Sequence, residues 1–337
     1  MTVAVTDEAR ESFTKALDAA DRRVAVELVS ALLDDGVDPL DVLLDLITPA
    51  QQVVGELWQS GEYTVAQEHA ATAVSEAAVG TVGAWIPEPL EPLGYAVVAC
   101  AEREWHALAA RIVAEALRHL GWRTTYLGAS TPAQHLAGYL HRLDPDVVAV
   151  SCSMPASLPA ARRIIEAAAE AGIPTLAGGR AFGTGPARAL ALGASGWASS
   201  PREAADVLAQ LRPVAEPVPA LAHAGADEQA ELLLRNRELA ERVLTSWLAA
   251  LAETGSDGLA GLDVEADYAV DHALHALAAA LLTDDVTVLH EGRDWLSTLL
   301  AARGCHRDAV PQLWAVLGRV AGSQLPVASK LLRQTTS

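Results

Sequence analysis

Apolar residues recur at helical spacing through the first 85 residues of the chain. In residues 24–33 they fall three or four positions apart, which places Val24, Leu28 and Leu32 on one face of a helix. Breaks follow at residues 36–39 and at Gly61. The pattern predicts an N-terminal bundle of about four helices over residues 1–90.

From Tyr95 onward the pattern changes to short β-branched runs that alternate with amphipathic helical stretches. The runs are 95–101, 122–128, 146–153, 173–179 and 195–200, and the helical stretches are 106–120, 132–142, 156–171, 186–192 and 201–211. Alternation of this kind predicts right-handed crossovers and a parallel sheet. We therefore expect a flavodoxin-like (Rossmann-like) five-stranded α/β domain over residues 91–212, with its ligand at the carboxyl ends of the strands.

The remaining chain is predicted to be a linker and an all-helical domain. Residues 213–225 are rich in Pro and Ala and show no periodicity, which is typical of a linker. Residues 226–337 contain four helical blocks, predicted at 226–253, 263–282, 284–303 and 307–333. The fold class is thus multidomain, with an α domain, an α/β domain and a second α domain.

Charge and composition exclude several classes of protein. The 337 residues include 43 acidic and 24 basic groups, a net charge of −19, which opposes binding to the phosphate backbone of nucleic acids. The uncharged apolar runs fall short of the roughly 20 residues that span a bilayer. The N-terminus carries acids where a signal peptide carries basic residues. We expect a cytoplasmic protein without nucleic-acid or membrane partners. Three cysteines without CxxC spacing indicate neither disulfides nor a structural zinc site.

Candidate chemistry lies at the ends of three predicted strands. Glu104 and His106 follow the first strand, where the carboxylate can hold one imidazole nitrogen while the other faces a metal. By themselves they are equally compatible with a helix-cap histidine and a solvated glutamate. Two further pairs end the third and fourth strands, namely Ser151 with Ser153, and Gly178 with Gly179, where missing side chains let a large flat ligand approach the backbone.

This combination resembles the cobalamin-binding domain shared by methionine synthase, the coenzyme mutases and the cobalamin photoreceptors. Their pattern of DxHxxG, SxL or SxT, and GG is similar to Glu104-x-His106-x-x-Ala109, Ser151-x-Ser153 and Gly178-Gly179. The resemblance implies that His106 is the lower axial ligand of cobalt, beside Trp105, and that the nucleotide tail passes Ser151 and Gly178. Glu replaces Asp at 104, and Ala replaces Gly at 109, where a methyl group can narrow the tunnel for the tail.

The preceding bundle contains a second signature. Trp58 stands ten residues before the adjacent pair Glu68 and His69. This spacing resembles the cap of the light-sensing cobalamin photoreceptors, in which the indole packs on the adenosyl group of adenosylcobalamin and the Glu-His pair lies nearby. An indole offers a broad stacking face for adenine. Without the neighbouring domain, Trp58 would be interpreted as a core residue, and Glu68 and His69 as surface residues of a helix. Gln59 stands where the transcriptional photoreceptors carry a His that takes the upper cobalt site after photolysis, so His69 or water remain as alternatives.

The C-terminal domain carries a third set of candidates on its predicted helices. They are His272, His275, His290, Arg293, Trp295 and Arg303. The arrangement of cap, cobalamin domain and C-terminal globin-like helical domain resembles the photocobilins, which carry adenosylcobalamin and the linear tetrapyrrole biliverdin. The resemblance implies that the arginines hold the two propionates and that the histidines and Trp295 line the slot. We favour noncovalent binding over a thioether to Cys305. An ordinary helical dimerisation bundle is the alternative.

Taken together, the resemblances predict a light sensor rather than an enzyme. Light homolyses the cobalt–carbon bond, and the cap and the oligomeric state then change. A homo-oligomer with light-dependent assembly and an unidentified downstream protein are the expected partners. Two other functions stay open: a corrinoid methyl carrier of a methyltransferase system, and a cobalamin-binding anti-repressor.

Overall fold

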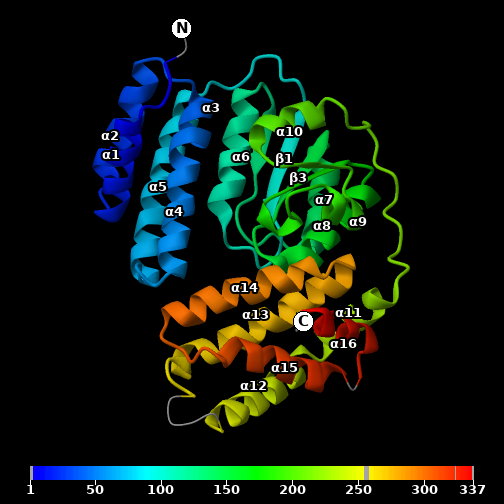
Figure 1. Cartoon of the computed structure of the whole chain (residues 1–337). Helices are drawn as coiled ribbons and strands as arrows, with labels where there is room; N and C mark the ends of the chain where they lie inside the picture. The colour runs from blue at the N-terminus through cyan, green and yellow to red at the C-terminus, as the bar shows by residue number, and fades with distance from the viewer. Residues whose placement is uncertain (1–2, 254–257, 323, 336–337) are drawn as a thin grey trace. The chain divides into compact units, whose positions relative to one another are not determined.

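The computed structural model describes residues 3–253, 258–322 and 324–335 (Figure 1). Its contacts divide the chain into two compact units. The first comprises Met1–Trp58 and Glu62–Val218, and the second comprises Gln59–Gly61 and Pro219–Ser337. The N-terminal bundle and the α/β domain predicted from the sequence therefore fall within one unit.

The N-terminal part of the first unit is helical. Its elements are α1 (Asp7–Asp18), α2 (Arg22–Asp34), α3 (Pro39–Asp41), the π-helix η1 (Val42–Ile47), α4 (Thr48–Gln59) and α5 (Val65–Trp85). The side chains of Thr6, Asp21 and Thr64 cap the starts of α1, α2 and α5 by accepting backbone hydrogen bonds. Because α3, η1 and α4 follow one another without a break, they form one continuous helical segment. Helices α1, α2, α4 and α5 run side by side (Figure 1).

A five-stranded parallel sheet forms the centre of the α/β part in the described residues. Its strands are β1 (Tyr95–Cys100), β2 (Arg123–Tyr126), β3 (Val147–Ser151), β4 (Thr175–Gly178) and β5 (Gly196–Ala198), in the order β2-β1-β3-β4-β5. The intervening elements are α6 (Ala107–His119), α7 (Ala133–Leu143), η2 (Pro155–Ser157), α8 (Leu158–Glu170), η3 (Arg180–Phe182), α9 (Ala187–Ala191) and α10 (Pro201–Leu208). This confirms the predicted sheet. The reversal of strand order lies between β1 and β3, where such sheets bind ligands.

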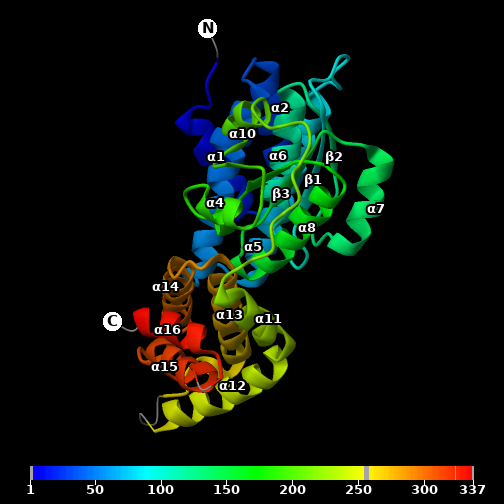
Figure 2. The same cartoon turned by 90° about the vertical axis from the view of Figure 1, so that its right-hand side faces the viewer.

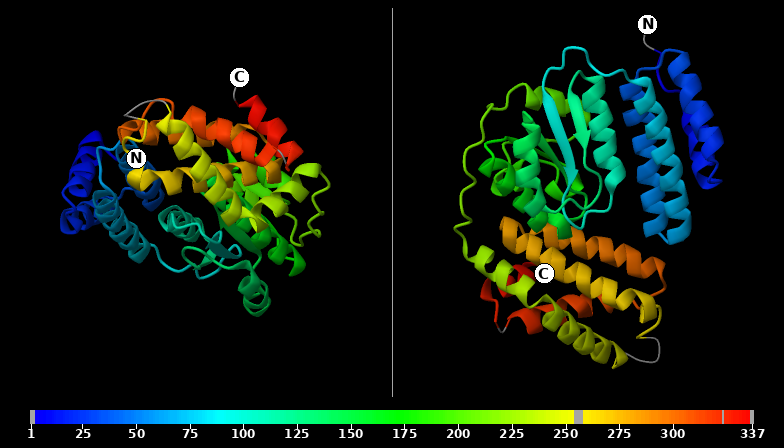
Figure 3. Two further views of the ribbon diagram at one scale, coloured as in Figure 1. Left: turned by 90° about the horizontal axis from the view of Figure 1, so that it is seen from below. Right: turned by 180° about the vertical axis from the view of Figure 1, so that it is seen from behind.

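Helix α6 joins the bundle to the sheet because both of its faces are apolar. Leu108 and Ile112 belong to the core of the N-terminal helices, whereas Ala110 and Ala114 belong to a core with β1, β3 and α10. The views in Figures 1 and 3 agree that α6 lies between α5 and the sheet. Arg118, near the end of α6, also donates a hydrogen bond to the carbonyl oxygen of Gly83 in α5. The bundle is therefore held directly against the first helix of the α/β part.

The second unit is helical throughout its described residues. Its helices are α11 (Ala224–Leu234), α12 (Asn236–Ala252), α13 (Leu262–Thr283), α14 (Thr287–Ala302), α15 (Ala309–Gly322) and α16 (Pro326–Gln334) (Figure 2). Two predicted blocks were wrong in extent. The block 226–253 is interrupted at Arg235, and the block 307–333 is interrupted before Pro326, which lacks the amide hydrogen needed to continue a helix.

Within the part of the chain that the structure describes, no helix has both the length and the apolar character needed to cross a membrane.

Candidate functional site

The loop after β1 brings Glu104 and His106 together at the carboxyl edge of the sheet. Arg103 has a positive φ of 68°, which turns the chain sharply between Cys100 and α6. The backbone amide of Glu104 then bonds the carbonyl oxygen of Ala101 at 2.9 Å. This turn directs the carboxylate of Glu104 inward, where it is fully buried, and leaves the side chain of His106 59% exposed.

The buried carboxylate of Glu104 accepts four hydrogen bonds. Oε1 accepts from the backbone amide of His106 at 3.0 Å and from its ring Nδ1 at 2.6 Å. Oε2 accepts from the backbone amides of Ser153 at 2.6 Å and Met154 at 2.9 Å. Burial by itself raises the pKa of this carboxyl group, but the bonds from His106 and from the backbone lower the pKa below its ordinary value. Glu104 is thus an anion that links the β1 and β3 loops.

His106 is oriented by this carboxylate. An ionised carboxylate only accepts hydrogen bonds, so Nδ1 of the ring must carry the proton. Among the described residues Nε2 has no hydrogen-bond partner, and it is the nitrogen left to act as a ligand. The bond with Glu104 raises the pKa of His106, burial lowers it, and the charges of Arg180 and Glu68 lower and raise it respectively. The net result is a pKa above the ordinary value of 6.5.

Replacing Glu104 with glutamine tests this arrangement in the protein without cofactor. We expect the pKa of His106, followed by NMR titration of its ring carbons, to lie above 6.5 in the parent protein and to fall in E104Q. The charged bond to Glu104 is lost, while burial and the positive charge of Arg180 still lower the pKa. An unchanged midpoint would show that Glu104 does not control the ring.

The ends of β3 and β4 approach each other closely beside this pair. Gly179 has a φ of 102°, and a Cβ atom there would lie 2.4 Å from the carbonyl oxygen of Cys152. The amide of Cys152 in turn bonds the carbonyl oxygen of Gly178 at 3.0 Å. Ser151, at the end of β3, is buried on the same face as Cys100, its partner in register. The predicted residues Ser151, Ser153, Gly178 and Gly179 are therefore brought to one edge, next to Glu104.

In the helical bundle, hydrogen bonds hold the predicted residues Glu68 and His69 in place. Nδ1 of His69 bonds Oε2 of Glu68 at 2.6 Å, and the hydroxyl of Thr72 donates to Oε1 of Glu68 at 2.9 Å. Gln51 of α4 donates to Thr72 at 2.7 Å and so ties the pair to the helix that carries the half-buried Trp58. The charge of Glu68 is close enough to His106 to raise its pKa. The two signatures thus belong to one region of the first unit.

Sequence reasoning missed several residues of this region. Thr72 and Gln51 hold Glu68 in place, and Thr72 was detectable because it stands four residues after Glu68 on the same helix. Arg180 follows the glycine pair directly and acts electrostatically on His106. The other indole of the region, Trp105, was predicted, and it is 74% exposed.

The structure brings together only part of the candidates in the second unit. The rings of His272 and Trp295 stack with centroids 4.7 Å apart, and Tyr268 lies 5.9 Å from Trp295. Burial lowers the pKa of His272 to about 4, and its Nε2 is buried without a hydrogen-bond partner. His275 is buried and bonds the carbonyl oxygen of Asp271 at 2.8 Å, whereas His290 is exposed.

The two predicted propionate ligands already have protein partners. Arg293 donates a hydrogen bond to the carbonyl oxygen of Thr335, and Arg303 pairs with Glu265 at 3.5 Å. Burial raises the pKa of the Cys305 thiol, which disfavours the thiolate that forms a thioether. Among the predicted residues of the second unit, His272 and Trp295 are therefore the pair whose rings stack on each other.

Comparison with known families matches both halves of the first unit. Residues 94–206 match a family model described as a B12 binding domain, and residues 9–82 match a second model of the same description. Glu104, His106 and the glycine pair lie within the first match, and Trp58, Glu68 and His69 lie within the second. The two matches indicate that the chain contains cobalamin-binding domains.

Individual relatives fall into two groups. The HTH-type transcriptional repressor CarH of Myxococcus xanthus is 34% identical over 142 residues, which cover 42% of this chain and 46% of the repressor. The trimethylamine corrinoid protein 1 of Methanosarcina mazei is 27% identical over 169 residues, 48% of this chain and 78% of that protein. The chain thus matches less than half of the repressor's length.

A solved structure shows the same fold. The monomethylamine corrinoid protein of Methanosarcina barkeri superposes with a TM-score of 0.53 at 18% identity, over 60% of this chain and 98% of that one. The fold and the two domain matches define a cobalamin-binding protein. Its relatives include a transcriptional repressor and corrinoid proteins.

Proposed function

We propose that the first unit holds adenosylcobalamin between His106 and the pair of helices that carry Trp58, Glu68 and His69. The observation that carries the proposal is the Glu104–His106 pair, in which a buried carboxylate accepts a hydrogen bond from the Nδ1–H group of the ring, orients the ring and leaves Nε2 as the nitrogen available to a metal. A neutral imidazole nitrogen of this kind is a common metal ligand. One nitrogen ligand of this kind fits the cobalt ion of cobalamin, because the corrin macrocycle supplies the other nitrogen ligands.

We further propose that the chain is a light sensor. When bound, adenosylcobalamin would supply a cobalt–carbon bond that light cleaves. Trp58 offers a stacking face for the adenine, and Glu68, held by Thr72, offers a carboxylate to the ribose hydroxyl groups. Loss of the adenosyl group would remove those contacts to Trp58 and Glu68 and would so shift the preferred position of their helices, as expected of a two-state equilibrium that a ligand biases.

The test is reconstitution with adenosylcobalamin in the dark, followed by green light. We expect the absorption spectrum and the oligomeric state, measured by light scattering after size exclusion, to change only on illumination. Methylcobalamin and hydroxocobalamin in the dark serve as controls for the contribution of the upper group. If cobalamin binds but light does not change the oligomeric state, the proposal of a light sensor is contradicted and the proposal of a cobalamin site is not.

Trp58→Ala separates adenosyl recognition from binding of the corrin. We expect W58A to lose about tenfold or more in affinity for adenosylcobalamin, because a buried aromatic contact contributes about 1–3 kcal/mol. Its affinity for hydroxocobalamin, which has no adenine, is expected to change little. Trp85→Ala, an exposed indole at the end of α5, is the matched control. Equal losses for both cobalamins would contradict a stacking role for Trp58.

The corrinoid methyl carrier is the second candidate, and the match to trimethylamine corrinoid protein 1 over 78% of its length favours it. Such a carrier exchanges a methyl group and needs no adenine contact. The carrier would be favoured if the protein binds methylcobalamin more tightly than adenosylcobalamin and if light does not change its oligomeric state.

We also propose biliverdin as a ligand of the second unit, and the stacked rings of His272 and Trp295 support this proposal. The neutral His272, whose Nε2 lacks a partner, can accept a hydrogen bond from a pyrrole N–H group. Titration of the full chain with biliverdin is expected to give a shifted red absorption band that His272→Phe weakens. Absence of the band would leave a helical dimerisation bundle as the alternative.

A further inference from the structure

A chain of three polar side chains connects helices α4 and α5 of the bundle. The side-chain nitrogen of Gln51, on α4, donates a hydrogen bond to the hydroxyl of Thr72, on α5, at 2.7 Å. That hydroxyl donates in turn to Oε1 of Glu68 at 2.9 Å. Thr72 follows Glu68 by four residues and therefore lies on the same face of α5. The chain thus ends on the carboxylate that is proposed to contact the ribose hydroxyl groups.

The donors and acceptors of this chain allow one arrangement of its hydrogen bonds. A carboxylate has no hydrogen to donate, so the hydroxyl hydrogen of Thr72 points to Glu68. The oxygen of Thr72 is then an acceptor, which requires the amide NH₂ group of Gln51 to face it. The other oxygen of Glu68, Oε2, is bonded by Nδ1 of His69 at 2.6 Å. Both oxygens are therefore held, and the carboxylate is fixed in one position on α5.

The same bond fixes the helix that carries Trp58. Gln51 and Trp58 are seven residues apart on α4, which is about two helical turns, so they share one face of that helix. The bond from Gln51 to Thr72 joins this face to α5, which lies beside α4 (Figure 1). Trp58 and Glu68 are proposed to contact two parts of one adenosyl group. The Gln51–Thr72 bond therefore joins the two helices whose spacing must match that group.

The amide of Gln51 is placed unfavourably for the stability of the bundle. Its side-chain oxygen is buried and has no hydrogen-bond partner among the described residues. An unpaired buried acceptor destabilises a fold, because it loses its hydrogen bonds to water without replacement. Such violations are expected at functional sites. The presence of Gln51 is therefore better explained by its bond to Thr72 than by a contribution to packing.

We propose that Gln51 and Thr72 are positioning residues that give the first unit a preference for cobalamin with an adenosyl upper group. They act through Glu68, because they hold its carboxylate where it accepts hydrogen bonds from the ribose. This selectivity rests on the proposed function, in which Glu68 contacts the adenosyl group. An upper methyl group has no ribose, so binding of methylcobalamin does not depend on the two residues.

The test is the ratio of the dissociation constant of methylcobalamin to that of adenosylcobalamin, measured in the dark by spectrophotometric titration of the full chain. We expect Thr72→Val, which lacks the hydroxyl, to lower this ratio about five- to tenfold. Thr72→Ser keeps the hydroxyl and is expected to keep most of the ratio. Gln51→Leu is expected to lower the ratio about threefold. Its unfolding temperature is expected to equal or exceed that of the parent protein, because the unpaired oxygen is removed as well.

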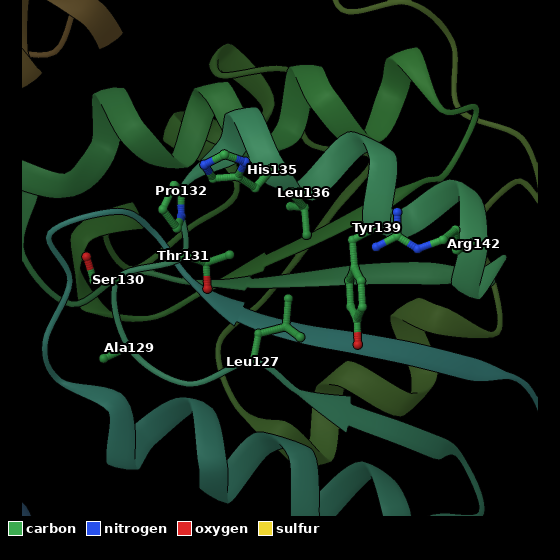
Figure 4. Close-up of a pocket in the computed structure, with 9 residues that line it drawn as sticks. All are labelled: Leu127, Ala129, Ser130, Thr131, Pro132, His135, Leu136, Tyr139 and Arg142. Carbon is green, nitrogen blue, oxygen red and sulfur yellow. The ribbon is translucent and has the colours of Figure 1, made fainter.

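Two variants of the same unit serve as controls for the loss of a hydroxyl group. Thr81→Val removes a hydroxyl from α5 that donates to the carbonyl oxygen of Ala77, in the same helix, at 3.0 Å. Tyr139→Phe removes a hydroxyl from α7, where Tyr139 lines a depression beside the loop that follows β2 (Figure 4). Both variants are expected to keep the parent ratio. An equal loss in T81V and T72V would show that a general loosening of α5 is responsible and would overturn the proposal.

Glu68→Ala distinguishes failure of this proposal from failure of the proposed function. In the E68A background, T72V is expected to have no further effect on the ratio, because Thr72 acts through Glu68. If E68A loses the preference for adenosylcobalamin while T72V and Q51L keep it, the positioning role is overturned and the proposed function is not. If the parent protein has no preference for adenosylcobalamin over methylcobalamin, the proposed function is contradicted and the selectivity assigned to Gln51 and Thr72 is overturned with it.

Discussion

Replacing His106 with alanine is expected to weaken cobalamin binding by at least about 10- to 100-fold, the range found when even outer-shell partners of a metal are removed. The visible spectrum of the cofactor that still binds is expected to be that of a cobalamin without a nitrogen ligand from the protein. The reason is that Nε2 of His106 has no hydrogen-bond partner among the described residues and lies beside the glycine edge of the sheet. Spectrophotometric titration in the dark measures both effects.

The fold should survive this substitution, because the His106 side chain is 59% exposed. His141→Ala, at an exposed position near the end of α7, is the matched control and is expected to bind like the parent protein. The cobalamin affinity of E104Q is expected to lie between those of H106A and H141A, because E104Q keeps the ring of His106 but loses the charge that orients it. If H106A binds cobalamin with unchanged affinity and an unchanged spectrum of the bound cofactor, His106 is not the cobalt ligand.

Replacing Gly179 with alanine is expected to lower the free energy of unfolding of the first unit by about 3 kcal/mol or more. Its φ of 102° is strained for any residue with a Cβ atom, and that atom would lie 2.4 Å from the carbonyl oxygen of Cys152. The ends of β3 and β4 must then move apart, and the loop that donates two amides to Glu104 moves with them. Urea denaturation followed by tryptophan fluorescence measures the loss.

Gly128→Ala separates the backbone strain of a positive φ from the close contact with Cys152. Gly128 has a φ of 84°, but a Cβ atom there has nothing within 4 Å. Its substitution carries the backbone strain alone and is expected to cost about 1–2 kcal/mol. If G179A and G128A lose the same stability, the close approach of the two strands does not matter for this fold.

Much of the α/β architecture was predictable because it depends on local patterning. Five β-branched runs alternating with helical stretches predicted a parallel sheet, and the order β2-β1-β3-β4-β5 confirmed it. The C-terminal blocks were predicted less well. The interruption at Arg235 has no Gly or Pro to mark it, so the sequence pattern does not reveal that α11 ends there.

The candidate cobalamin site was predictable as a set of residues but not as an arrangement. The motif spacing identified Glu104, His106 and the glycine pair, because each must stand at a strand end. It did not reveal that both oxygens of Glu104 are used, one by His106 and one by the β3 loop. The longer side chain of Glu compared with Asp reaches amides that lie 49 and 50 residues further along the chain.

The sequence by itself determined the order of elements, the parallel sheet and the residue types at its ligand edge, because hydrophobic periodicity and glycine positions are local properties. Only the tertiary structure decided that the N-terminal helices share a core with α6, that His272 stacks on Trp295, and that Glu104 joins His106 to the loop after β3. Those contacts join residues far apart in the chain. Their partners are chosen by packing, which no single stretch of sequence encodes.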